Sequence, residues 1–435
     1  MTFWNFVRAQ WTHLPLIPTE AAITGGTYIV TGANTGLGFE CAKTLVNLGA
    51  KRVILGVRSI EKGNTAVAAI AKETGREDVC QVWHLDLASL DSVEEFAKKL
   101  QSLDRIDALI QNASVAFADF TLSEGVETTL TVNVLSTMLL AIRAMPKLQE
   151  SARAFSINPH LVIVSSLTGF QCEGVLEKHQ GDLFEALSTK EADMVGRYPL
   201  SKLLQIYATR QLASLFPLSE TGVVVNVLNP GLCKTELNRN ARGFMKYQIL
   251  LLRLFIGRTP EQGSRTLLHA AVAGTESHGK YVSDCEIKEY LVPGWVFDES
   301  GLHMQRRVWM DLLKNLNAKG NHQSWLLLPS QVNAIRHCPF PNGLKHVKAK
   351  LSKQQAPKSN NPLQANKKGL IYHDQLDLIL GPRFLFKPPF PNMIGHGDAR
   401  DQQLFPPKPW RVISRAANLP PTKKPGSDLL DVDRL

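Results

Sequence analysis

An apolar strand that runs directly into a glycine-spaced turn constrains the fold of this chain more than any other feature. Residues 28–38 read YIVTGANTGLG, and a helix-like segment follows at once. Gly32 permits the tight turn, Gly36 lets the backbone approach a pyrophosphate, and Gly38 lets helix and strand pack closely. Leu37 stands between the last two, where the new helix presents its free N–H groups to phosphates. The pattern predicts a dinucleotide-binding turn, with a glycine turn of purely steric origin as the alternative.

Residues 27–283 alternate between strand-like and helix-like stretches, which predicts an α/β fold with a doubly wound parallel sheet. Buried parallel strands are nearly continuous apolar runs, as at residues 161–164. We therefore predict one Rossmann-type domain over residues 1–319, without a separate substrate domain. About seven strands are expected, at residues 27–31, 52–57, 80–85, 107–112, 160–165, 223–228 and 279–282.

Charge and proline content separate residues 320–435 from the rest of the chain. This stretch holds 17 Lys and Arg residues, seven Asp and no Glu, so it accounts for the whole net charge of +10. It also holds 15 of the 24 prolines. This composition predicts a largely disordered tail. Because its basic residues are loosely spaced, no nucleic acid partner is expected, and a basic nucleic-acid-binding tail is the alternative.

Cysteine use and hydropathy bear on the compartment. Six scattered cysteines show neither metal-ligand spacing nor a disulfide framework, which favours a reducing, cytoplasmic location without a metal site. No run of 18 apolar residues exists, so no membrane span is expected. Residues 1–18 lack the features of a signal peptide and are predicted to lie on the domain as an arm. Peripheral membrane attachment through this arm and residues 244–256 is the alternative.

Arg58 ends the second predicted strand, 20 positions after Gly38, where such sheets place the residue that reads the ribose. No acid is available there to bind a free 2′-hydroxyl. A guanidinium can bind a 2′-phosphate through two charge-assisted hydrogen bonds. The sequence therefore favours NADP(H) over NAD(H), and an ordinary exposed arginine is the alternative.

Two polar residues follow the next strands at the same predicted edge. Asp86 is a candidate to accept from the adenine amino group, or simply to cap the following helix. Asn112 ends the fourth strand at the same edge and is a second candidate for binding the cofactor, although loop packing would explain an asparagine there almost as well.

Tyr198 and Lys202 are four residues apart, so they share one face of a predicted helix. A free phenol titrates near pH ~10, and a fixed ammonium beside it favours the phenolate. This arrangement predicts that Tyr198 is a general acid–base. Ser165 and Ser166 end the fifth strand, and only one of them can face the same edge.

These motifs together resemble the short-chain dehydrogenase/reductase family, in particular the retinol-dehydrogenase-like group of fungal secondary metabolism. Residues 31–38 match its TGxxxGxG motif, and Tyr198 and Lys202 match its YxxxK motif. The resemblance implies that Ser166 is the catalytic serine and that Thr235, after the sequence NPG, bonds the nicotinamide carboxamide. It also allows a homo-oligomer.

Asn133 matches the helical asparagine of the family. The resemblance implies that it holds a water that passes protons to Lys202, and a buried asparagine bonded to backbone is the alternative. Two features depart from the family pattern. Ser114 replaces the usual glycine of its NNAG element, and residues 171–195 form an insertion before Tyr198. The insertion and residues 244–256 are expected to form the rim and lid of the substrate pocket.

The resemblance thus implies an NADP(H)-dependent oxidoreductase that interconverts a carbonyl and an alcohol on an apolar small molecule, such as a polyketide- or terpenoid-derived ketone. A non-catalytic Rossmann regulator that senses nicotinamide redox state is the alternative. Sensors of that kind commonly lose the Tyr–Lys pair, which this chain retains.

Overall fold

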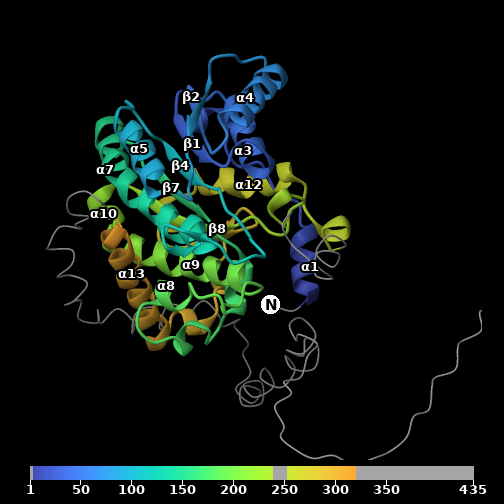
Figure 1. Cartoon of the computed structure of the whole chain (residues 1–435). Helices are drawn as coiled ribbons and strands as arrows, with labels where there is room; N and C mark the ends of the chain where they lie inside the picture. Colours follow the sequence, from blue (N-terminus) through green and yellow to red (C-terminus); the bar gives the residue numbers. More distant parts are fainter. Residues whose placement is uncertain (1–2, 239–251, 320–435) are drawn as a thin grey trace, which may run out of the picture. The chain divides into compact units, whose positions relative to one another are not determined.

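The sheet carries the fold, and its strands follow the predicted positions closely. The structure, a computed structural model, describes residues 3–238 and 252–319. Its eight-stranded sheet has the order β10-β9-β8-β7-β4-β1-β2-β3 (Figure 1). All neighbours are parallel except β9 and β10. The strands are β1 (Thr27–Thr31), β2 (Arg52–Val57), β3 (Cys80–His84), β4 (Ala108–Gln111), β7 (His160–Val164), β8 (Val224–Asn229), β9 (Tyr281–Ser283) and β10 (Glu286–Ile287).

The order of the strands reverses beside β1. The chain moves outward from β1 to β2 and β3, and then returns to the other side of β1 with β4. In such sheets ligands bind outside the carboxyl ends of the strands at this reversal. The predicted Rossmann-type fold is therefore confirmed, and it places the candidate site beyond the ends of β1 and β4.

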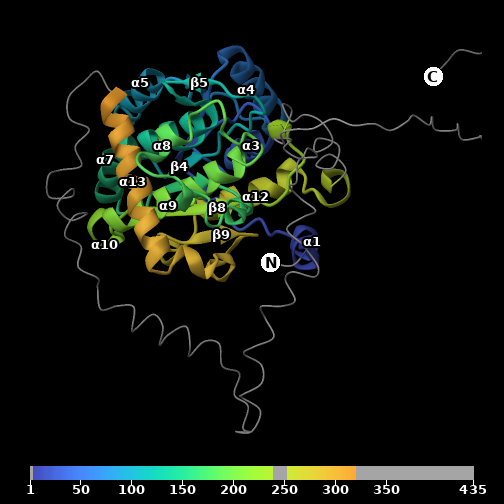
Figure 2. The same cartoon turned by 60° about the horizontal axis from the view of Figure 1, so that its bottom comes forward.

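Helices cover both faces of the sheet, and each face has its own apolar core (Figures 1 and 2). Successive strand residues alternate between the two cores, so Leu109 lies in one and Ile110 in the other. One core involves helices α5 (Leu90–Gln101), α7 (Thr137–Phe155), α9 (Arg197–Leu215) and α13 (Glu299–Lys319), and the other involves α3 (Gly36–Asn47), α4 (Ile60–Thr74) and α12 (Pro260–Ala270). The shorter helices are α1 (Phe3–Trp11), α2 (Glu20–Ile23), α6 (Thr128–Leu130), α8 (Leu183–Ala186) and α10 (Leu218–Thr221).

The prediction of seven strands missed one sheet strand and a separate hairpin. β10 pairs antiparallel with β9 through a turn in which Asp284 and Cys285 have φ values of 53° and 58°. Non-glycine residues rarely adopt this conformation, so the turn lacked the glycine that predicts a hairpin. β5 (Leu122–Ser123) and β6 (Val126–Glu127) form the other hairpin. Strands of two residues are too short to show a period of two.

Helix α13, which packs against α9, contacts the insertion before Tyr198 (Figure 2). Asp182 caps α8 and accepts two bonds from Asn315, while the Arg307 guanidinium donates to two carbonyl groups of the insertion. This attachment shows that the middle of the insertion is anchored on α13. The predicted tail, residues 320–435, lies outside the described residues.

Candidate active site

The glycine turn after β1 has the geometry that a dinucleotide requires. Gly32 and Gly36 have φ values of 65° and 62°, a region that favours glycine. A Cβ added at Gly36 would meet nothing closer than Thr235 Cγ2 at 3.6 Å, so the backbone there is open to a ligand. The Leu37 side chain packs against Gly263 of α12, and a side chain at position 263 would displace it. These residues fit the pyrophosphate of a nicotinamide dinucleotide.

Gly38, in the first turn of α3, packs tightly against the glycine turn and Asn112. A Cβ there would lie 2.7 Å from both Gly32 O and Asn112 Nδ2. Asn112 itself donates to Thr31 O at 3.0 Å, so its side chain holds the turn in place. The loop-packing role considered for Asn112 is therefore present in the structure.

Gly38→Ala should consequently lower the free energy of unfolding by about 1–3 kcal/mol, since overpacked sites cost that much. It should also weaken NADPH binding, because the turn must shift. Chemical denaturation and fluorescence titration with NADPH measure the two effects. Gly294→Ala is the matched control, because a Cβ there meets nothing within 4 Å. Equal stability of both variants would contradict the close approach at Gly38.

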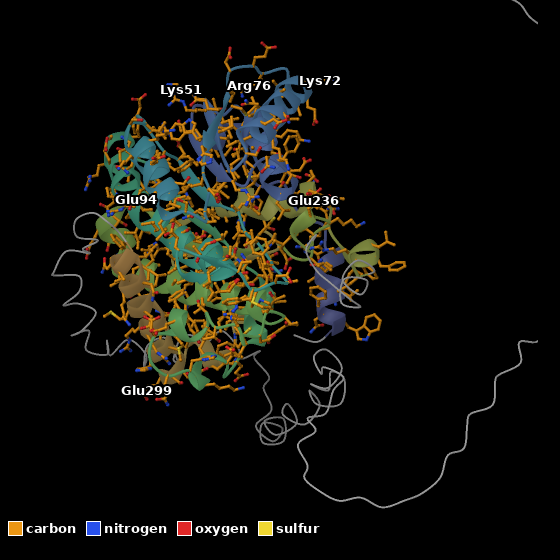
Figure 3. All side chains as sticks on the ribbon, in the orientation of Figure 1. Lys51, Lys72, Arg76, Glu94, Glu236 and Glu299 are labelled. Carbon is orange, nitrogen blue, oxygen red and sulfur yellow. The ribbon has the colours of Figure 1, made fainter. Side chains whose placement is uncertain are left out.

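The residues predicted to read the adenosine half lie at the ends of β2 and β3. Arg58 is exposed and makes no hydrogen bond or ion pair among the described residues, so its guanidinium is available to a ligand. Asp86 is half-buried, and one carboxylate oxygen accepts from Ala88 N at 3.0 Å. Ser89 rather than Asp86 caps α5. Lys51 lies just before β2, at its amino end, and Glu236 lies one residue beyond Thr235. Figure 3 shows these two side chains well apart, so the amino end of β2 is not part of the candidate site.

The two serines after β7 have separate roles. Ser165 is buried and donates to Lys202 O at 2.9 Å, which joins β7 to α9. Ser166 is half-buried, its hydroxyl accepts from Thr168 N and Thr168 Oγ1, and it lies close enough to Tyr198 to lower the pKa of that phenol. Only Ser166 therefore faces Tyr198, as the alternation of strand side chains requires.

Tyr198 and Lys202 lie on one face of α9, and the ammonium lies over the tyrosine ring. Lys202 Nζ is 5.4 Å from the centroid of the Tyr198 ring. It donates to Val164 O and to Gln205 Oε1, both at 2.9 Å. The Lys202 side chain is 1% exposed, and this burial lowers its pKa to about 7.

The expected depression of the Tyr198 pKa by Lys202 is not found in the structure. Burial raises the pKa of Tyr198, while Arg253 and the hydrogen bond with Ser166 lower it. The difference has a physical cause: desolvation disfavours the phenolate, and a lysine that loses its proton near neutrality attracts it weakly. Arg253 is the cation that acts on this hydroxyl.

Asn133 lies in a buried π-helical segment, η1 (Thr131–Ser136), rather than in a regular α-helix. Such segments are frequent at functional sites. Its side-chain amide donates to Val115 O and Ser201 Oγ and accepts from Val115 N and Ser114 Oγ. The amide is therefore bonded within the protein, and Ser114 contributes a bond that the usual glycine could not make.

The loop after β8 brings Thr235 beside the glycine turn. Thr235 Cγ2 is the nearest atom to the space above Gly36, which suits contact with the middle of a bound dinucleotide. Arg253 Nη1 donates to Thr235 O at 2.7 Å. Leu254 and Phe255 are 64% and 70% exposed, whereas Arg253 lies close enough to Tyr198 to lower the pKa of that phenol. The first part of that lid lies outside the described residues.

Three residues that shape this loop were missed by the sequence analysis. The Gln10 side chain exchanges two hydrogen bonds with the main chain of Leu232. Arg258 donates to Pro230 O at 3.0 Å and pairs with the buried Asp284 at 2.5 Å. No sequence motif marks these residues, because the bonded partners are far apart in the chain. Gln10 and Leu232 are 222 positions apart, and Arg258 is 28 positions from Pro230 and 26 from Asp284. The N-terminal arm is thus a helix, α1, that anchors the loop.

Gln10→Ala should lower the free energy of unfolding by about 1–3 kcal/mol, because buried backbone groups of the loop lose their partner. It should also weaken NADPH binding several-fold, since Thr235 belongs to the same loop. Gln101→Ala is the control. Gln101 is an exposed glutamine at the end of α5, away from the loop, and its side chain also donates to a carbonyl group, Arg143 O. Unchanged NADPH affinity in Gln10→Ala would show that α1 does not position the loop.

The fold and site together define an α/β oxidoreductase with a dinucleotide-binding turn and a Ser–Tyr–Lys group at the carboxyl edge of the sheet. A family model described as short chain dehydrogenase matches residues 27–176. The short chain dehydrogenase/reductase dmxR8 of Cryptosporiopsis sp. (strain 8999) is 40% identical over 301 residues, which cover 68% of this chain and 91% of that protein. The short-chain dehydrogenase anuD of Penicillium roqueforti (strain FM164) is 37% identical over 334 residues, which cover 76% and 87%.

A crystal structure of an uncharacterized protein from Mycobacterium paratuberculosis shares the fold, with a TM-score of 0.51 and 22% identity over 69% of this chain and 97% of that one. The chain belongs to the short-chain dehydrogenase/reductase family, whose members use NAD(P), and the family predicted from the motifs is confirmed. Within the described residues, one helical stretch, Thr128–Phe155, is long and apolar enough to cross a membrane. Its most apolar window is 89% buried inside the protein, as in a core helix.

Proposed function

We propose that this protein is an NADP(H)-dependent oxidoreductase that interconverts a carbonyl and an alcohol on an apolar small molecule. The observation that carries the proposal is the meeting of Ser166, Tyr198 and Lys202 at the edge of the sheet where the glycine turn lies. A bound nicotinamide would supply or accept the hydride. The protein must then hold the substrate oxygen and move one proton.

The roles of the side chains follow from what they touch. Tyr198 would donate its phenolic proton to the carbonyl oxygen, and Ser166 would hydrogen-bond that oxygen as charge develops. Lys202 would hold the nicotinamide ribose through its ammonium group. Asn133 would stabilise the loop at Ser114 and the start of α9 rather than contact the substrate.

NADP(H) is favoured because Arg58 is the exposed cation at the end of β2. Its guanidinium has no partner among the described residues, and its planar fork suits a 2′-phosphate. The other carboxylate oxygen of Asp86 accepts no hydrogen bond from the described residues, which suits the adenine amino group.

The substrate that suits the site has an apolar body and an oxygen acceptor near the reacting carbonyl. The acceptor is inferred from Arg253, which lies close enough to Tyr198 to lower its pKa and has a buried Nε without a hydrogen-bond partner among the described residues. A second carbonyl or a carboxylate would satisfy that nitrogen. A polyketide-derived ketone carries such groups, and a terpenoid-derived ketone with an adjacent oxygen is equally compatible.

A screen of ketones and alcohols with NADPH and NADP+, read by the absorbance of the reduced cofactor, tests the proposal. We expect turnover with apolar ketones that carry a second oxygen acceptor, and faster turnover with NADPH than with NADH. A protein that binds NADPH but reduces no member of a broad panel would instead support the non-catalytic alternative.

A further inference from the structure

A glutamine side chain occupies the position between Lys202 and Asn133 where the family resemblance implies a water. Gln205 Oε1 accepts from Lys202 Nζ at 2.9 Å, and Gln205 Nε2 donates to Asn133 O at 2.5 Å. The three residues are each 0–1% exposed. The bridge between the lysine and the π-helical segment is therefore made by the protein itself.

The fold explains why a glutamine can make this bridge. Gln205 follows Lys202 by three residues on α9, so the two side chains lie on one helix face. A carboxamide offers an acceptor and a donor on separate atoms, which matches an ammonium on one side and a carbonyl on the other. Every polar atom of the bridge is thus paired, as a fully buried group requires.

The bridge also determines which way the ammonium points. An ammonium has three donors. Val164 O takes one and Gln205 takes another, so one remains for a ribose hydroxyl. An amide cannot pass a proton between its oxygen and nitrogen as a water does, so Gln205 orients Lys202 without relaying protons to it.

We propose that Gln205 is a positioning residue that replaces the relay water and holds Lys202 toward the nicotinamide ribose. This inference rests on the proposed function, because it concerns the same site. It predicts that the space of the glutamine amide must contain a hydrogen-bonding group, and that the group can be either a side chain or a water.

Two substitutions at Gln205 separate this role from simple packing. Gln205→Ser frees space beside Lys202 Nζ and Asn133 O, and the serine hydroxyl adds a third polar group, enough to order a water there. Gln205→Leu fills the space without any hydrogen bond. Gln211→Leu is the matched control, because Gln211 is a buried glutamine on the same helix that bonds Gln305 at 3.0 Å, away from Lys202.

NADPH affinity, measured by fluorescence titration of the full chain, is the first readout. We expect Gln205→Leu to raise Kd about tenfold, because Lys202 loses a hydrogen bond to a charged group. Gln205→Ser should stay within about threefold of wild type, since an ordered water is nearly as good as a direct bond. Gln211→Leu should leave Kd unchanged, although it lowers thermal stability as Gln205→Leu does.

The pH dependence of Kd is a readout that a packing role would not move. Lys202 faces the Val164 carbonyl on β7, and the Gln205 amide and the Tyr198 ring on its own helix. Within the described part of the chain, no charged side chain contributes to its pKa. The anionic cofactor prefers the ammonium, so affinity should fall as pH rises above about 7. In Gln205→Leu the ammonium loses an acceptor, so the fall should begin at lower pH; Gln205→Ser and Gln211→Leu should follow wild type.

Wild-type Kd and pH dependence in Gln205→Leu would overturn the inference, and so would equal damage in the Ser and Leu variants. A wild-type protein that binds neither NADPH nor NADH would overturn the proposed function itself, and this inference with it.

Discussion

Tyr198→Phe should reduce kcat by about a thousandfold or more, whereas NADPH should still bind. Positioned acid–base groups contribute roughly 10²–10⁴-fold to the rate. Among the described residues, the other candidate proton donor near Tyr198 is Cys233, but it is buried and its pKa is raised to about 12, so it could not take over the proton transfer. The substitution removes one oxygen and keeps the ring, so Lys202 retains its neighbour at 5.4 Å. Steady-state kinetics with a ketone from the screen, together with NADPH titration, measure both effects.

Tyr207→Phe is the matched control for that experiment. Tyr207 lies on the same helix, is 1% exposed, and its hydroxyl has no hydrogen-bond partner among the described residues. Its removal should leave kcat unchanged. If Tyr198→Phe also turned over at the wild-type rate, Tyr198 would not be the proton donor, and the proposed chemistry would fail while the fold assignment stood.

Arg58→Asp should reverse the preference between the two cofactors. The loss of charge-assisted hydrogen bonds and the repulsion of the 2′-phosphate should weaken NADPH binding by about 100-fold, because each such bond contributes roughly 1.5–3 kcal/mol. The new carboxylate should accept from the free 2′-hydroxyl of NADH, so NADH binding should improve. Fluorescence titration with each reduced cofactor gives the ratio directly.

Arg52→Asp provides the control for charge alone. Arg52 begins β2 and Arg58 follows its last residue, so the same change is made at the opposite end of one strand. Arg52→Asp should leave the NADPH-to-NADH ratio unchanged. A similar shift in both variants would mean that net charge, rather than a contact with the 2′-phosphate, determines the preference.

Patterns of short range determined the fold class and much of the candidate site. The glycine spacing at Gly32–Gly38, the apolar strand runs and the Tyr198–Lys202 spacing each depend on residues that are neighbours in sequence. Parallel strands also bring their carboxyl ends to one edge, so the sequence alone assigns Ser166 and Arg58 to that edge. The short strand β10 could not be found this way, because its turn uses Asp284 and Cys285 rather than glycine.

Tertiary contacts decided the remainder, and they involve residues far apart in the chain. Packing brings Gln10 to Leu232 and Arg253 to the neighbourhood of Tyr198, and no local pattern encodes either meeting. Burial lowers the pKa of Lys202 to about 7 and raises that of Tyr198. Packing places the amide of Gln205 between Lys202 and Asn133. Residue spacing selects the groups that share a helix face, whereas desolvation and long-range packing decide their charge and their partners.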